Sequence, residues 1–310
     1  MRLIKPSFEI LEQGPDLLGV FKQIELAGRT CYKSLDKITD NSAEDFVNRM
    51  IASKHYAMLE HGTIYLAIPC EFNGNQHNES WKESKYNSNP YSKVRREYVE
   101  SERNYVDFIT TNLRVLIENN WLDDLQYLCE PTEFHEKRVT VRFTTDRGVS
   151  HEFVRHRVFS FAQESTRYCN YSKDKFGNEL TFIIPCWVDL EEGCWGVGHD
   201  FVFGFFYHII GENDHIYPKT EQEIDNLDFL QALKSDENKY LRLIKRGKTP
   251  QQARQILPNA LKTELVMTGF ISDWQHFFDL RARGTTGAPH PDAKALAEPL
   301  MHEFETRNLI

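Results

Sequence analysis

The stretch RHRVFSFAQESTRY, residues 155–168, concentrates side chains that bind anions. Three arginines and a histidine lie within thirteen positions, with hydroxyl groups between them: Arg155, His156, Arg157, Ser160, Ser165, Thr166 and Arg167. The planar guanidinium group suits the oxygens of carboxylates and phosphates, and loop hydroxyls and amides complete phosphate sites. Since the chain has a formal net charge of −9, the cluster needs either its own carboxylates or the phosphates of ligands as partners.

The spacing of the first two arginines leaves both kinds of partner open. If residues 150–157 form a short helix with Ser150 as its N-cap, Arg155 and Arg157 are about 200° apart around the helix. They would then serve two different anionic ligands. Alternatively, both arginines pair with nearby carboxylates such as Glu152 and Glu164.

The composition is that of a globular protein, with 310 residues of which 40% are hydrophobic and 13% aromatic. No apolar run approaches the roughly eighteen residues of a membrane span, and the start of the chain lacks the pattern of a signal peptide. Six cysteines without a C-x-x-C pair are typical of reduced thiols, which predicts a cytoplasmic protein. The acidic balance argues against a nucleic-acid-binding surface, so any phosphate site must be local.

The elements that must position these residues are read from periodicity and capping signals. Strands are expected at 2–11, 63–68, 137–146 and 180–187. Helices are expected at 15–27, 42–54, 107–120, 121–130, 150–157, 250–278 and from about Asp292, and a loop is expected from the end of the 150–157 helix to about 170. Thr249, Pro250 and Gln252 supply a strong helix start, and Pro258 and Gly269 are expected to kink and weaken the long helix that follows.

The pattern predicts an α+β fold in which an antiparallel sheet packs with long helices. A polar, Asn- and Ser-rich stretch at 71–92 is expected to be an exposed excursion. The chain is therefore predicted to be a single domain, 1–310, with an inserted region at about 71–137.

The arginine cluster is part of a longer sequence pattern. R-H-R, seven residues, then Ser165, completed by Arg167 and Tyr168, resembles the signature of the flavin-dependent thymidylate synthases. Four further blocks resemble elements of that family and occur in its order: AGRTCYKS (27–34), HYAMLEH (55–61), ARQILP (253–258) and DWQHFFDLR (273–281).

The resemblance implies an enzyme that methylates deoxyuridylate (dUMP) at C5 to give dTMP. The carbon would come from 5,10-methylenetetrahydrofolate, and the hydride from FAD that NADPH has reduced. Residues implied to bind dUMP are Glu152, Arg155, Gln163, Glu164, Ser165, Thr166, Arg167, Arg254 and Arg281. Residues implied to contact FAD are His55, Ala57, Glu60, His156, Arg157, Val158, Gln163, Ser272, His276 and Leu280.

Arg281 matches the arginine on the uracil edge and is the expected catalytic side chain, because a guanidinium there favours the anionic N3 imide. The alternative is an exposed arginine at a helix C-terminus. Ser165 is expected to bind phosphate or sugar, since no histidine is placed in sequence to activate it as a nucleophile.

The resemblance also implies a homotetramer with active sites shared between subunits. On one continuous helix Arg254 and Arg281 would be roughly 40 Å apart, which predicts that a single nucleotide meets them from different chains.

Two other functions remain open on the sequence alone. The arginines could hold a nucleotide or an RNA phosphate without chemistry. A metal hydrolase could use His55, His61 and His151, although the spacing of His55, Glu60 and His61 fits no common zinc pattern, so no metal is expected. Neither nucleic acid nor a membrane is an expected partner of the enzyme.

Overall fold

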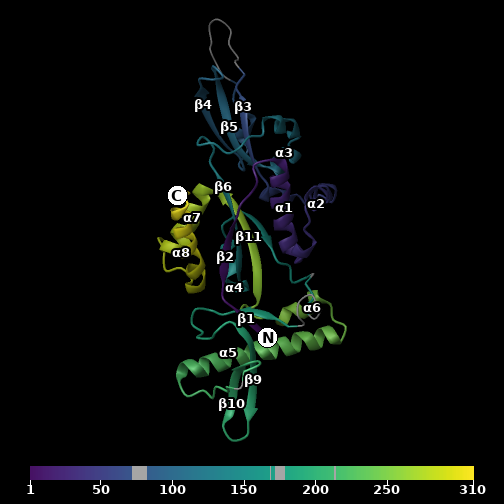
Figure 1. Cartoon of the computed structure of the whole chain (residues 1–310), viewed down its shortest axis with the longest axis vertical. Coiled ribbons are helices and arrows are strands. Elements are labelled where there is room, and N and C mark those ends of the chain that lie inside the picture. Colours follow the sequence, from purple (N-terminus) through teal and green to yellow (C-terminus); the bar gives the residue numbers. More distant parts are fainter. Residues whose placement is uncertain (72–81, 168, 172–178, 213) are drawn as a thin grey trace.

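The computed structural model describes residues 1–71, 82–167, 169–171, 179–212 and 214–310. Tyr168 and residues 72–81 of the expected excursion at 71–92 therefore lie outside the described residues. Figure 1 shows an elongated molecule in which three sheets follow one another along the long axis. No helix of the described part is both long and apolar enough to cross a membrane.

The middle sheet is antiparallel throughout, as the sequence predicts. Its order is β2 (Ser7–Leu11), β6 (Arg138–Asp146), β11 (Lys262–Phe270) and β7 (Ser160–Gln163). β6 and β11 pair over nine positions, from Lys262 opposite Asp146 to Phe270 opposite Arg138. This long ladder defines the relative position of everything attached to its two ends.

Helices cover both faces of the middle sheet (Figure 1). On one face lie α7 (Ile271–Phe278) and α8 (Pro291–Thr306), and on the other α1 (Leu17–Tyr32), which also packs against α2 (Ser42–Ala52). The first face is filled by fully buried aromatic side chains, Phe143, Phe153, Trp274, Phe277, Phe278 and Phe304. The second is filled by small residues such as Ala27 and Ala162, so α1 approaches the sheet closely.

The upper sheet has the order β3 (Thr63–Pro69), β5 (Asn104–Asn112), β4 (Lys93–Val99). Short 3₁₀ helices surround it at Tyr56–His61, Lys85–Ser88 and Leu122–Tyr127. The predicted helix at 107–120 is wrong in its first half, because residues 107–112 belong to β5 and only α3 (Leu113–Glu118) is helical. Asn112 ends the strand and caps the helix by accepting a hydrogen bond from the Val115 amide (3.2 Å).

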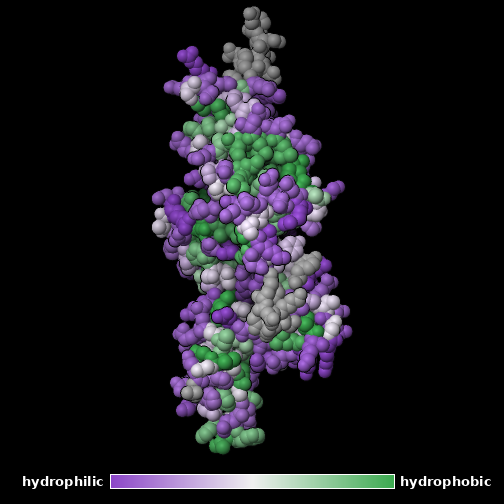
Figure 2. Space-filling model, turned by 45° about the vertical axis from the view of Figure 1, so that its right-hand side comes forward, coloured by the Kyte–Doolittle hydropathy of each residue, from purple (hydrophilic) through white to green (hydrophobic). Residues whose placement is uncertain are grey.

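The lower sheet has the order β10 (Gly204–Ile209), β9 (Gly193–Asp200), β1 (Arg2–Ile4), β8 (Thr181–Ile183). It packs on α5 (Glu221–Lys245), the longest described helix, which the sequence reading missed together with the β9–β10 hairpin. The tip of this hairpin exposes Phe201, Val202 and Phe203, at the lower end of Figure 2. The expected opening strand is in fact two strands in different sheets, since Pro6 cannot donate to a ladder.

The helix expected at 150–157 begins and ends earlier. α4 spans Arg147–Phe153, and its N-cap is Asp146, whose carboxylate accepts from the Val149 amide (2.8 Å), rather than Ser150. Arg155 and Arg157 follow the helix, so the 200° argument does not apply to them. β7 also occupies part of the expected loop.

The helix expected at 250–278 is the largest error. The structure has α6 (Pro250–Ala253), a 3₁₀ turn (Arg254–Ile256), then β11 and α7. The helix start at Thr249 is confirmed, with the side-chain Oε1 of Gln252 accepting from the Thr249 amide (3.1 Å). β11 is buried on both faces and its apolar residues do not alternate with polar ones, so its sequence lacks the two-residue period that would mark a strand. The 40 Å separation inferred for Arg254 and Arg281 is thereby overturned.

Replacing Gly269 by alanine should change the stability in opposite directions, depending on whether residue 269 lies in a strand or in a helix. A Cβ added at Gly269 in β11 would lie 2.5 Å from ring atoms of Phe159, which is itself held in the aromatic core. Gly269→Ala should therefore lower the free energy of unfolding by about 1–3 kcal/mol. In a helix the same change would raise it by about 1 kcal/mol. Urea unfolding of the two proteins decides between a strand and a helix.

Candidate active site

The first group of predicted site residues meets beyond the C-terminal end of α4. Arg281, from the π-helical turn Asp279–Arg283, donates from Nε to His156 Nε2 (3.1 Å). It also donates from its two terminal nitrogens to the carboxylate (2.9 Å) and the backbone carbonyl (2.8 Å) of Glu152. The Arg155 guanidinium lies 3.5 Å from the same carboxylate and is largely exposed.

These contacts leave the first group with an excess of positive charge. Burial, followed by the charge of Arg281 and His276, lowers the pKa of His156 to about 4, so its ring is neutral and Nε2 accepts. Two arginines then face the single carboxylate of Glu152. Arg281 has five N–H donors, of which these bonds use three, so it retains donors for an anionic or carbonyl oxygen.

The second group meets at the loop after β7. Thr166 Oγ1 accepts from Arg254 (3.1 Å), Arg167 Nε donates to the Gln251 side chain (3.3 Å), and Ser165 Oγ accepts from the Arg167 amide (3.3 Å). Hydroxyls, a backbone amide and two guanidinium groups thus come together from segments far apart in sequence. Such a set suits phosphate oxygens.

Glu164 lies beneath this loop rather than on its surface. It is 2% exposed, and its carboxylate contacts Lys262 Nζ (2.9 Å) and the hydroxyl of Tyr171 (3.2 Å), with Lys33 Nζ at 3.7 Å. Burial lowers the pKa of Lys262, but the neighbouring carboxylates outweigh it and the net shift is upward, so the lysine stays charged. The structure therefore gives Glu164 a supporting position.

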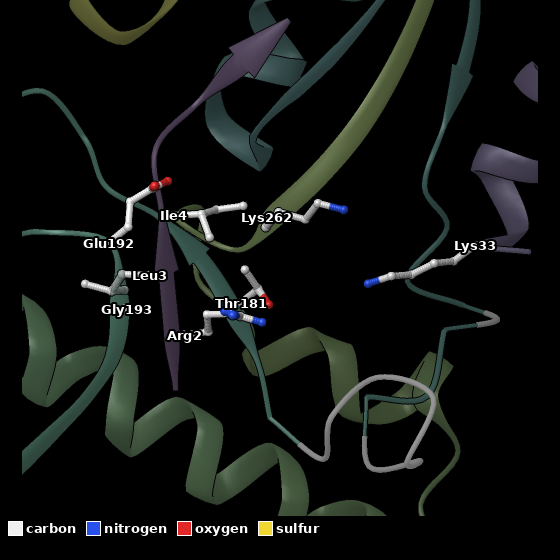
Figure 3. A pocket seen from close by; sticks show the side chains of 8 residues that line it. All are labelled: Arg2, Leu3, Ile4, Lys33, Thr181, Glu192, Gly193 and Lys262. Atoms are coloured by element: carbon white, nitrogen blue, oxygen red, sulfur yellow. The ribbon is translucent and has the colours of Figure 1, made fainter. Parts of the chain in front are cut away.

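Lys33 and Lys262 reach toward one another across an adjoining pocket of about 430 Å³ (Figure 3). Arg2 and Thr181 line the same pocket from the lower sheet. The sequence reading missed both lysines, because it placed residue 262 within a helix and gave the helix end at 33 no role.

α4 connects the two groups within one chain. At its first residue, Arg147 donates to the Glu164 carbonyl (3.4 Å). One turn on, the Ser150 hydroxyl accepts from the Gln163 side chain (2.8 Å), and Glu152 near the other end binds Arg281. A seven-residue helix is about 10 Å long, and α4 thus lies between the two groups in the chain.

Some of the residues expected at FAD gather in a different place, a pocket of about 400 Å³ at the Phe270 end of β11. Glu60, Arg157 and Val158 line it, and Ser272 is linked to its wall through Lys93 Nζ (3.0 Å). The remaining expected contacts are not among its lining residues: His55, Ala57, His156, Gln163, His276 and Leu280. His55, Ala57 and His276 are exposed, and the His276 ring lies 6.2 Å from that of His156.

Arg138 is a further lining residue that the sequence reading did not single out. It donates to the Glu60 carbonyl (3.0 Å), Thr63 Oγ1 (3.3 Å) and Ser160 Oγ (3.4 Å), and its enclosed Nε has no partner. Within the described part of the chain, no carboxylate lies within the 4.0 Å of an ion pair from its guanidinium. Burial lowers the pKa of Arg138 to about 10, so it still carries a charge at neutral pH.

The histidines of the hydrolase alternative lie in unlike surroundings. His61 is fully buried against Thr268 (2.8 Å), whereas His55 and His151 are exposed. In the ranges that the structure covers, no three His, Cys, Asp or Glu side chains are grouped to hold a metal ion.

Comparison with known proteins places these groups in a family. A family model described as thymidylate synthase complementing protein matches residues 118–307, more than half of the chain. The chain belongs to this family. The match contains both groups around α4, the loop after β7 and the turn that carries Arg281.

Individual flavin-dependent thymidylate synthases align with a smaller part of this chain than the family model does. The flavin-dependent thymidylate synthase of Corynebacterium diphtheriae is 32% identical over 136 residues, which are 44% of this chain and 45% of the relative. A probable flavin-dependent thymidylate synthase of Paramecium bursaria Chlorella virus 1 is 27% identical over 55% of this chain and 69% of its own. The aligned part thus spans less than half of the corynebacterial relative.

Among solved structures, a UMP/dUMP methylase of Streptomyces cacaoi aligns with 99% of this chain and 92% of its own. The TM-score is 0.44 and the sequence identity 14%.

The depressed pKa of His156 makes stability depend on pH with a defined sign. An unfolded histidine takes up its proton near pH 6.5, and folded His156 only near pH 4. The stability that neutral His156 contributes is therefore complete above pH 6.5 and is lost as the pH falls toward 4, by roughly 1–3 kcal/mol.

His156→Gln keeps an acceptor for Arg281 but cannot titrate, so its unfolding free energy should fall less steeply over this window. Buried His61, with a pKa lowered to about 3, is expected to supply the slope that remains. Denaturant unfolding at pH 4.5 and 7 measures both slopes, and equal slopes in the two proteins would contradict this assignment.

Proposed function

We propose that this protein is a flavin-dependent thymidylate synthase. It converts dUMP to dTMP with 5,10-methylenetetrahydrofolate as carbon donor, FAD as cofactor and NADPH as reductant. Membership of the thymidylate synthase complementing family supports the proposal, as do the flavin-dependent relatives. The observation that carries it is Arg281, which Glu152 and His156 hold in place with donors to spare, within one short helix of a phosphate-type loop.

The second group would hold the phosphate of dUMP. Ser165, Thr166, Arg167 and Arg254 supply hydroxyl, amide and guanidinium donors. Their charge is not cancelled by Glu164, whose carboxylate is already engaged by Lys262 and Tyr171. Ser165 makes no hydrogen bond to a described histidine or carboxylate that could activate it, which favours binding over a covalent role.

The first group would hold the uracil ring. The free donors of Arg281 would contact a pyrimidine oxygen and favour the anionic N3 imide, which makes C5 more electron-rich toward the one-carbon unit. Glu152 orients Arg281 and offsets part of its charge, and neutral His156 adds no positive charge of its own. Arg281 is thus the proposed catalytic residue.

The residues around the Phe270 end of β11 fit a flavin cofactor. Arg157 and Arg138 are cations beside the pocket, Val158, Phe159 and Phe270 offer apolar surface, and the unpartnered Nε of Arg138 leaves a positive charge to be balanced. A pocket of about 400 Å³ lies within the range of small-molecule sites. When bound, FAD supplies the hydride that reduces the transferred carbon to a methyl group.

Three further parts of the proposal come from the sequence, the last of them through the family resemblance. They are a single domain over 1–310, a cytoplasmic location, and a homotetramer with shared active sites. The argument from one continuous helix no longer supports sharing, since β11 interrupts that helix. Mass measurement in solution tests the tetramer.

The cofactor makes a direct prediction. The purified protein should show the absorbance of bound flavin, and anaerobic NADPH should bleach it. Formation of dTMP, followed by chromatography, should require both dUMP and 5,10-methylenetetrahydrofolate. A protein that binds nucleotide but neither FAD nor the folate would instead be the non-catalytic phosphate-binding protein that the sequence leaves open.

Arg281→Lys should abolish dTMP formation, with at least a hundredfold loss in kcat, and leave flavin bound. Lysine keeps the charge but loses the planar fork that contacts Glu152, His156 and substrate together. Arg283→Lys is the matched control, because Arg283 lies on the same turn and, among the described residues, pairs with Asp279 (2.8 Å) and with no group of the candidate site. Wild-type turnover in Arg281→Lys would refute the role given to Arg281.

A further inference from the structure

The pocket at the Phe270 end of β11 is lined by residues from inside and outside the part that the family model matches, Glu60 being among those outside it. Arg157, Val158 and Phe270 belong to the part that the family model matches. The opposite wall consists of residues from the 82–112 segment that leads into and forms the upper sheet: Pro90, Tyr91, Lys93 and Asn112. The family match begins only at residue 118, so this wall lies outside it.

We propose that the 82–112 segment supplies a ligand-binding wall of this pocket. The Tyr91 ring stacks on the heterocycle of a dinucleotide, and Lys93 and Arg138 face its phosphates. The chemical class is a phosphorylated aromatic heterocycle, which FAD and NADPH share. This inference rests on the proposed function and gives a role to a region for which the family resemblance provides none.

Tyr91 has the placement of a stacking residue. Its side chain is 59% exposed at the pocket, although it is large and aromatic. Asn89 Oδ1 accepts from the Tyr91 amide (2.9 Å) and the Ser92 hydroxyl (3.2 Å), and Ser92 Oγ lies 2.8 Å from Thr111 Oγ1 of β5. The turn is thereby fastened to the sheet, so the backbone that carries the Tyr91 ring is held at the pocket before a ligand binds.

Lys93 joins this wall to the family part of the pocket. Its ammonium contacts Glu136 (3.0 Å) and Ser272 Oγ (3.0 Å) and lies 5.0 Å from the centre of the Phe270 ring. The Arg138 guanidinium lies 5.5 Å from the same ring. Two cations from different segments therefore flank Phe270.

The charges of the pocket require an anion. Glu136 offsets Lys93, and Glu60 is engaged by Arg114 (2.5 Å). Asp273 accepts from the Phe270 amide (3.1 Å) and makes no ion pair with a cation among the described residues. Arg138 and Arg157 have no ion-pair partner among the residues that the structure describes, so a phosphate would balance them.

The test is FAD affinity, measured by quenching of flavin fluorescence in protein prepared free of flavin. Tyr91→Ala should raise the Kd for FAD about tenfold or more, and Tyr91→Phe should stay near wild type, because the ring and not the hydroxyl makes the contact. Tyr98→Ala is the matched control. Tyr98 is 54% exposed on β4, packs against Tyr105 (5.3 Å between ring centres) and does not line the pocket.

Lys93→Gln tests the same wall through FAD affinity, at a residue outside the turn that carries Tyr91. It should weaken FAD binding and flatten the dependence of Kd on salt, since one phosphate contact is removed. Thermal unfolding of each variant checks that the fold is kept.

A second measurement, KM for NADPH, identifies which dinucleotide the pocket binds. If Kd for FAD is unchanged but KM for NADPH in flavin reduction rises by the same factor in Tyr91→Ala, the wall holds NADPH, and the inference stands. If both constants stay within twofold of wild type in Tyr91→Ala and Lys93→Gln, the inference is overturned while the proposed function survives. A wild-type protein that binds no flavin would instead remove the proposed function.

Discussion

The pairing of β6 with β11 is the constraint on which the candidate site depends. Nine residue pairs fix the two strands against each other, so both ends of the ladder are defined at once. At one end, Asp146 leads into α4 and Lys262 reaches Glu164 beneath the phosphate-type loop. At the other, Arg138 and Phe270 form the floor of the second pocket. The aromatic core behind the sheet then locks α7, and with it Arg281, against the end of α4.

The two ends of the ladder share a local surplus of positive charge, although the chain as a whole is acidic. Each collects more guanidinium and ammonium groups than carboxylates, and the carboxylates present are committed to internal contacts: Glu152 to Arg281, Glu164 to Lys262, Glu60 to Arg114. Burial lowers the pKa of both His156 and Arg138. The pKa of His156 falls to about 4, so the histidine is neutral at pH 7, whereas that of Arg138 stays at about 10, so the arginine remains charged. The unmatched positive charge is therefore local, as phosphate-bearing ligands require, while the rest of the surface remains acidic.

The elements that carry the candidate site could be predicted from the sequence only in part. The strand at 137–146, the antiparallel sheet and the last helix are confirmed, because alternation and capping are local signals. The helix expected at 250–278 fails because a strand buried on both faces shows no alternation. α5 was overlooked although Thr220 and Glu223 form a capping box before it. Lys262, Arg138 and Tyr91 could not be found, since only strand pairing and a distant turn bring them to the pockets.

The proposed function requires the cations at the two ends of α4 to hold a phosphorylated pyrimidine. Calorimetric titration of the flavin-loaded protein with dUMP, and separately with deoxyuridine, measures this requirement. We expect saturable binding of dUMP that weakens as salt is added, and binding of deoxyuridine at least about a hundredfold weaker because it lacks the phosphate. Equal affinity for the two compounds, or no binding of dUMP, would contradict it.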